Sequence, residues 1–166
     1  MCCYDKKTRK FKKYETDPNN PYSISHNEIW SIEIDNYQHI WAVSIYGILN
    51  MLDQETERFY KFKNDPSDPF SFNEGYSCFM HLDKENLLWI VTTRGLEMLD
   101  LNKNNVNVPN PKVKFTHFLA DRKKGSISSN NLYACAEDNE GNMWFGSDEG
   151  WINKYDRKTN TFTVIT

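Results

Sequence analysis

Residues 33–53 decide the fold of this chain, and they read EIDNYQHIWAVSIYGILNMLD. The same pattern returns at residues 81–100 as HLDKENLLWIVTTRGLEMLD and at residues 136–156 as AEDNEGNMWFGSDEGWINKYD. In each copy an aspartate stands six residues before a tryptophan, and a glycine stands six residues after it. The tryptophans are 48 and then 55 residues apart. Periods of about this size are typical of solenoids and propellers, so the chain is a repeat protein.

The positions that recur in all three copies predict the framework of the fold. A tryptophan buries roughly 150–250 Å², and we expect each ring to pack between neighbouring units. A glycine permits the positive φ of a tight turn. The aspartates recur with the tryptophans, so structure explains them better than catalysis. We therefore assign structural roles to Asp35, Asp83 and Asp138, to Trp41, Trp89 and Trp144, and to Gly47, Gly95 and Gly150.

Each copy predicts four short β-strands joined by turns. Apolar residues alternate with polar ones or form short runs between turn signals, without the sustained 3.6-residue period of a helix. A second pattern, Asp-x-x-Thr-x-x-Phe, begins at Asp5, Asp53 and Asp156. Its short polar side chains favour a tight turn before an outer strand. Four-stranded antiparallel meanders of this period are typical of β-propeller blades, so the predicted fold class is all-β.

The repeats divide the chain into three complete blades and part of a fourth. A closed propeller needs roughly four to eight blades, so we expect an incomplete propeller whose exposed faces invite self-association or the docking of further blades. Residues 102–114 are extra in the middle copy and are predicted to form an exposed loop. Within one domain, residues 1–166, the expected units are residues 4–14 (the end of a preceding blade), 15–62, 63–118 and 119–166.

Composition and charge exclude several classes of function. The net charge is −3, and no basic stripe runs among the aromatic residues, so we expect no nucleic-acid partner. No apolar run approaches the roughly 20 residues of a membrane span, and the first residues lack the apolar core of a signal peptide. We therefore expect no membrane contact within this segment. Cys135 shares a repeat position with Ile32 and Met80 and is interpreted as a small core residue.

Motifs for catalysis or metal binding are missing from the sequence. The four histidines show no paired metal spacing. Residues 138–142, DNEGN, resemble a calcium loop and the Asp-box of sialidases. The bidentate glutamate of the first and the leading serine or threonine of the second are missing, and a hairpin turn fits better. No order typical of a catalytic triad is present. We expect no catalytic residue, no metal and no cofactor.

Loop residues that differ between the copies at one register are the candidates for ligand binding, because loops on a rigid scaffold carry recognition. An exposed tyrosine beside an arginine is suited to stack on, and hydrogen-bond to, an anionic sugar. The simpler interpretation is that these are ordinary solvated turn residues. The candidates are Tyr46, Arg94 and Glu149 before the turn glycine, and His26, Glu74 and Ser129 ahead of the first strand.

The complete repeat, Asp-x5-Trp followed by the glycine, a closing aspartate and x2-Thr-x2-Phe, resembles the two-component regulator propeller repeat. The resemblance covers three full copies and the tail of a fourth, residues 4–166. It implies the periplasmic sensor region of hybrid two-component histidine kinases, which in Bacteroides-type gut bacteria sense products of glycan breakdown. Such sensors also carry further repeats, a membrane span and kinase modules, so the chain is expected to be a partial copy.

The sequence leaves three functional hypotheses. The first, implied by the resemblance, is a ligand-binding sensor module in two-component signal transduction, which recognises a carbohydrate or another small extracytoplasmic ligand without catalysis. The second is a protein-interaction scaffold whose exposed blade edges meet a partner or a second copy. The third is an enzyme built on a propeller, for which this sequence lacks the catalytic residues.

Overall fold

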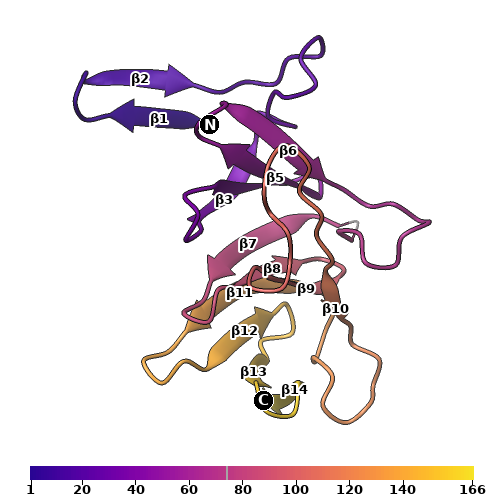
Figure 1. The fold of residues 1–166 in the computed structure, drawn as a ribbon. Coiled ribbons are helices and arrows are strands. Elements are labelled where there is room, and N and C mark those ends of the chain that lie inside the picture. The colour runs from indigo at the N-terminus through magenta and orange to yellow at the C-terminus, as the bar shows by residue number, and fades with distance from the viewer. Residues whose placement is uncertain (74) are drawn as a thin grey trace.

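The structure, a computed structural model, describes residues 1–73 and 75–166. Every regular element in these residues is a β-strand, and the strands form four antiparallel sheets (Figure 1). The strands of the four sheets are, in chain order, β1 (Cys2–Asp5) and β2 (Lys10–Lys13); β3 (Ile29–Ile34), β4 (Ile40–Ser44), β5 (Ile48–Asp53) and β6 (Arg58–Phe62); β7 (Ser77–Leu82), β8 (Leu87–Thr92), β9 (Gly95–Asp100) and β10 (Thr116–Phe118); and β11 (Leu132–Glu137), β12 (Met143–Ser147), β13 (Ile152–Asp156) and β14 (Thr161–Ile165).

Strand order within each sheet follows the chain, as in a meander. The hairpin β1–β2 is followed by three four-stranded sheets, which we call the first, second and third sheets. These three are stacked one below the other in Figure 1, with β3 against β7 and β7 against β11. The described sheets do not close into a ring. The predicted all-β class, β-propeller blades in an incomplete propeller, is confirmed.

The repeated aspartate organises the turn between the first and second strands of each sheet. One carboxylate oxygen of Asp35 accepts a hydrogen bond of 2.9 Å from the Trp41 indole, and the same bond is 2.8 Å long in the second and third sheets. The other oxygen accepts the backbone N–H groups of Tyr37 and His39 within the turn. Burial raises the pKa of Asp35, but the bonds from His39 and Trp41 outweigh burial and leave that pKa below its ordinary value.

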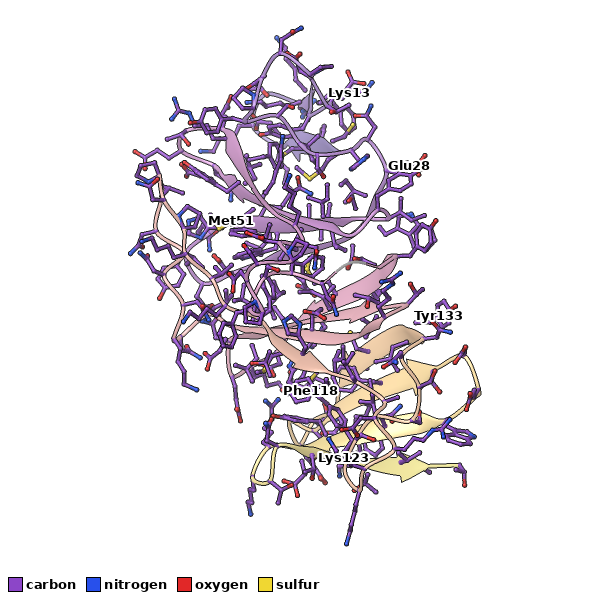
Figure 2. All side chains as sticks on the ribbon, turned by 90° about the vertical axis from the view of Figure 1, so that its right-hand side faces the viewer. Lys13, Glu28, Met51, Phe118, Lys123 and Tyr133 are labelled. Atoms are coloured by element: carbon purple, nitrogen blue, oxygen red, sulfur yellow. The ribbon has the colours of Figure 1, made fainter. Side chains whose placement is uncertain are left out.

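Two of the three tryptophans fill the spaces between sheets. Trp41 is fully buried in the core that joins the first and second sheets, together with Met51, which lies inside the stack in Figure 2. Trp89 is fully buried between the second and third sheets, against Phe145. Trp144 is partly exposed on the far face of the third sheet, outside both cores.

The Asp-x-x-Thr pattern forms the predicted tight turn. Asp5 accepts the backbone N–H groups of Lys7 and Thr8, and the Thr8 hydroxyl donates to the same carboxylate at 2.8 Å. Asp53 and Thr56 make the corresponding bonds at the end of β5. These turns fix where the outer strand begins in the hairpin β1–β2 and in the sheet of β3–β6.

The extra residues of the second repeat are more than an exposed loop. Asn105 and Lys112 form an isolated antiparallel bridge. Val106 is 3% exposed within the core that contains Trp41, and Val113 packs against that core. The prediction of an exposed loop is wrong for these valines, because the nearby prolines signal a turn and carry no information about the burial of their neighbours.

Candidate functional site

The turns between second and third strands lie at the same end of the sheets as the segments that precede the first strands. In the second sheet, the N–H of Thr93 in the turn donates to the carbonyl of Tyr76 at 3.0 Å, just before β7. In the third sheet, the N–H of Asp148 donates to the carbonyl of Asn131 at 3.1 Å. The second and third sheets thus each end in a compact pair of loops held by a backbone bond.

Glycines allow close approach of the backbone at this end, both between sheets and within one sheet. Gly47 has a φ of +68°, and a Cβ added there would lie 2.5 Å from the carbonyl oxygen of Gly75, in the segment before β7 of the second sheet. A Cβ on Gly95 would lie 2.7 Å from the carbonyl oxygen of Phe118 in the same sheet. Gly150, at the same position of the third sheet, has open space around it. The glycines of the first two sheets therefore serve close packing as well as the turn conformation.

A cleft of about 530 Å³ opens at this end, and all three four-stranded sheets contribute to it. Tyr46 comes from the first sheet and is 56% exposed. Tyr76 comes from the second and is 58% exposed. The described lining consists of Tyr46, Gly75, Tyr76, Thr93, Arg94 and Asn131.

Arg94 is the one charged residue in the described lining of this cleft. Its backbone N–H donates to the Thr92 hydroxyl at 3.0 Å, which fixes the turn. A Cβ added to Gly75 would lie 3.3 Å from the Cβ and Cγ of Arg94, so the arginine stem passes close to that backbone. Among the described residues the guanidinium has no hydrogen-bond or ion-pair partner. A guanidinium can bind an anionic group with two parallel hydrogen bonds.

The structure brings three of the four principal candidates together. Tyr46 and Arg94 both line the cleft. The His26 ring lies 4.8 Å from the Tyr46 ring, centroid to centroid, and its buried Nδ1 has no hydrogen-bond partner within the described part of the chain. Glu149 is exposed in the turn of the third sheet and does not line the cleft.

The remaining two candidates, Glu74 and Ser129, add no further described residue to the cleft. Glu74 lies outside the described residues. The Ser129 hydroxyl donates to the Asp148 carboxylate at 3.0 Å, so it is occupied within its own sheet.

Sequence reasoning missed Tyr76 and Asn131, although a signal for them was present. Both stand immediately before the first strand of their sheets, in the position that Glu28 holds in the first sheet. Three different residues at one loop register are the same kind of variation that selected Arg94. The candidates His26, Glu74 and Ser129 stand two residues earlier in the same segments.

The described lining combines one charged group with neutral hydrogen-bonding groups. It offers one cation, two phenols, one hydroxyl and one amide, with no carboxylate, imidazole or thiol among the described lining residues to act as a base or nucleophile. Over the described chain, no group of three or more histidine, cysteine or acidic side chains is arranged to hold a metal ion.

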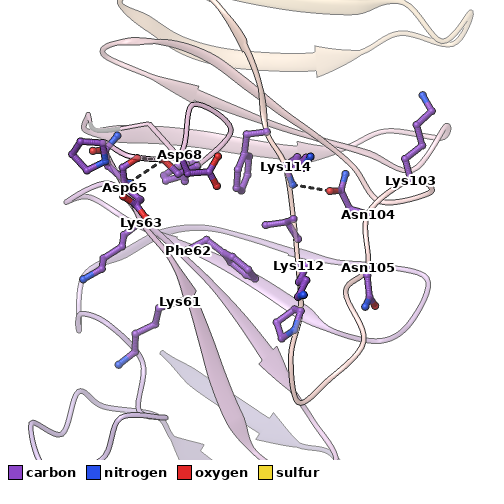
Figure 3. A pocket seen from close by; sticks show the side chains of 17 residues that line it. Lys61, Phe62, Lys63, Asp65, Asp68, Lys103, Asn104, Asn105, Lys112 and Lys114 are labelled. Atoms are coloured by element: carbon purple, nitrogen blue, oxygen red, sulfur yellow. Dashed lines mark hydrogen bonds between the residues drawn. The ribbon is translucent and has the colours of Figure 1, made fainter.

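A larger cleft of about 1050 Å³ lies between the end of β6 and the extra segment of the second repeat (Figure 3). Phe62 lies at its centre, with Lys61 and Lys63 on one side and Lys112 and Lys114 on the other. Lys61 and Lys63 extend away from Phe62 in this view. The lysines therefore share no common focus, and none of the candidate residues lines this cleft.

These sheets and their open ends define a segment of a β-propeller, and solved structures share the arrangement. The extracellular domains of two hybrid two component systems from B. thetaiotaomicron, BT3049 and BT4673, each match with a TM-score of 0.70 and 22% identity. The matches cover 96% and 93% of this chain and 20% of each of those chains. Virginiamycin B lyase from Staphylococcus aureus matches with a TM-score of 0.64 and 14% identity, over 99% of this chain and 47% of the lyase.

These likenesses show the fold, and this chain spans about a fifth of the length of the two extracellular domains. The sequence adds a family signature. The profile described as two component regulator propeller matches residues 126–149, which contain Asp138 and Trp144. The predicted resemblance to this repeat is confirmed. No curated protein matches the chain in sequence. In the part of the chain that the structure describes, no helix has the length and apolar character to cross a membrane.

Proposed function

We propose that this chain is a segment of the ligand-sensing propeller of a two-component signalling system. The regulator-propeller signature at residues 126–149 supports this proposal, as does the likeness to extracellular domains of hybrid two component systems. On this proposal the segment works in the periplasm, and the membrane span and the kinase belong to other parts of the complete protein.

The ligand is an acidic carbohydrate, held between Tyr46, Tyr76 and Arg94. The observation that carries this proposal is the guanidinium of Arg94, which has no partner among residues 1–73 and 75–166, beside two exposed tyrosines in a cleft. The guanidinium suits a carboxylate, and tyrosine rings offer flat apolar faces with a polar tip to a sugar. Three sheets contribute to the cleft, so a ligand bound there favours one arrangement of these sheets over others. A sensor needs such a difference in affinity between two arrangements.

The segment binds this ligand without converting it. The likeness to virginiamycin B lyase means that the fold itself is compatible with catalysis. The described lining of the cleft, however, offers no carboxylate, imidazole or thiol as a general base or nucleophile.

Calorimetric titration with an oligogalacturonate, an oligoglucuronate and a neutral cello-oligosaccharide tests the proposal. We expect binding of at least one acidic saccharide and not of the neutral one. Arg94→Gln weakens that binding about tenfold or more, because a hydrogen bond to a charged group contributes about 1.5–3 kcal/mol. Tyr46→Ala also weakens it.

Glu149→Gln is the matched control, because Glu149 holds the register of Arg94 in the third sheet but lies outside the cleft; we expect its affinity to be unchanged. Failure of every saccharide to bind, or equal binding by wild type and Arg94→Gln, would overturn the assignment and favour the interaction scaffold. Turnover of a bound saccharide would revive the enzyme hypothesis.

A further inference from the structure

The first strand of the first sheet is exposed where its counterparts are buried. Ile32, Met80 and Cys135 hold the same register, each opposite the second strand of its own sheet. Met80 is 0% exposed and Cys135 is 8% exposed, but Ile32 is 47% exposed. Ile34, two residues on and therefore on the same side of β3, is 53% exposed. We call these two isoleucines the β3 face.

The first two strands of the preceding sheet cover this position in the other sheets. β7 lies against β3 and β4, and β11 lies against β7 and β8. The sheet that precedes β3 is the hairpin β1–β2, which carries Asp5 and Thr8 in the positions of Asp53 and Thr56. It therefore corresponds to the third and fourth strands of a blade, and the described chain contains no first and second strands for it.

The hairpin covers only the outer part of the first sheet. The Tyr14 ring lies 5.5 Å from that of Phe59, and Leu52 and Phe59 are buried beneath Met1 and Tyr14. Figure 1 shows β1 and β2 projecting to one side, beyond β3. Within the described residues β1 pairs with β2 alone, so its other edge presents unpaired backbone groups.

We propose that the free edge of β1 and the β3 face form one docking surface for a two-stranded antiparallel hairpin. One strand of this hairpin extends the sheet from β1, and side chains from the pair cover Ile32 and Ile34. The occupant is built like the first two strands of this repeat, with a large aromatic side chain on its second strand. It comes from polypeptide outside residues 1–166.

A second copy of this chain does not supply such a hairpin intact. Its three pairs of first and second strands are already bonded to their own third strands, as β4 is to β5, β8 to β9 and β12 to β13. If one pair moved to another molecule, all hydrogen bonds between its second strand and the third strand of its own sheet would break. The two extracellular domains with the same fold are about five times as long as this chain, which is ample polypeptide for the missing pair.

The test adds the missing strands. A copy of residues 28–48 is fused before Met1, because Met1 corresponds to Leu49, the residue after that segment. We expect Tm to rise by about 5–10 °C, as two isoleucine side chains and a sheet edge become covered in a domain of this size. Backbone amides of β1 should also exchange with deuterium at least tenfold more slowly than in the unextended chain.

Two controls separate docking from a general effect of length. The first is the same extension with Asp35→Ala and Trp41→Ala in the added copy only, which should raise Tm little. The second is Ile32→Lys in the original copy, which should leave the unextended chain unchanged and abolish the gain from the extension. An equal rise with the altered extension, or none with the intact one, overturns the proposal. So does an unextended chain that dimerises and becomes monomeric with Ile32→Lys, because a second copy is then the occupant.

Discussion

The second and third sheets have the same repeat and the same strand order, but they differ in what surrounds them. The second sheet packs on both faces, and Trp89 is fully buried. The third packs on one face, and Trp144 is partly exposed. Both indoles donate the same 2.8 Å bond to the aspartate six residues earlier. The aspartate–tryptophan unit is therefore a local feature set by spacing in the chain, whereas the energy gained from the ring depends on a neighbouring sheet.

The largest effect expected from this difference is that of Trp89→Ala. The ring lies 5.2 Å from Phe145 and 4.9 Å from Tyr155, centroid to centroid. Removing it leaves a cavity between two sheets, and we expect a loss of about 3–5 kcal/mol in the free energy of unfolding. Urea denaturation followed by circular dichroism measures this loss. A loss below ~1 kcal/mol would mean that the second and third sheets are not packed as described.

Asp83→Ala tests whether the aspartate of the second sheet stabilises the fold more than Asp138 of the third sheet does. Arg157 of the third sheet donates to Asp83 at 2.9 Å, so this carboxylate also ties two sheets together. We expect a loss of about 2–3 kcal/mol, below the ~3–5 kcal/mol of a fully buried pair because Arg157 keeps some contact with water. Asp138→Ala, measured by the same denaturation, should cost less. Equal losses would show that the bond to Arg157 contributes nothing.

The fold was largely predictable from the sequence because its signal is local and repeated. The Asp-to-Trp spacing and the turn glycines identified the strands and their order. The bond from Arg157 to Asp83 was not predictable, because it joins residues 74 positions apart and has no counterpart in the other copies. Of the candidate site, Tyr46, Arg94 and His26 were found by their loop register. The position of Glu149 outside the cleft depends on how the three sheets are oriented relative to one another, which the sequence does not show.

The second sheet also replaces a buried amide with a buried acid. Asn50 and Asn153 accept backbone N–H bonds from the segment before the first strand of their own sheets. Glu97 holds this position in the second sheet, is 0% exposed, and lies 2.5 Å from Nδ1 of His117. The other ring nitrogen of His117 lies 3.0 Å from the Pro69 carbonyl oxygen. Both ring nitrogens thus face acceptors, which favours the doubly protonated ring.

This pair predicts a pH dependence that the third sheet lacks. The hydrogen bond to Glu97 raises the pKa of His117 in the folded protein. Protonated His117 therefore stabilises the fold fully below the unfolded pKa of about 6.5, and this stabilisation is lost as the pH rises through the folded pKa. We expect Tm to fall above about pH 6.5, by roughly 2–4 °C for each ~1 kcal/mol lost. Differential scanning calorimetry across this range measures the fall. In His117→Gln, Tm should change little over this pH range. The control Asn153→Asp places an acid in the third sheet without a histidine, and it should leave the fall of Tm unchanged. An unchanged slope in His117→Gln would assign the pH dependence to another group.

The smallest effect is expected for Trp144→Ala, the counterpart of the first substitution. The described contacts of the Trp144 ring are its bond to Asp138 and the Lys154 ammonium 5.0 Å from its centroid. An exposed contact of this second kind contributes about 0.5–1 kcal/mol. We expect a loss of about 1 kcal/mol in urea denaturation, several-fold below that of Trp89→Ala. In a longer chain whose next repeat packs on the third sheet, the same substitution should cost as much as Trp89→Ala, because the ring is then buried. A loss of that size in residues 1–166 alone would show that this face is already covered by another molecule, and dilution of the protein would then reduce it.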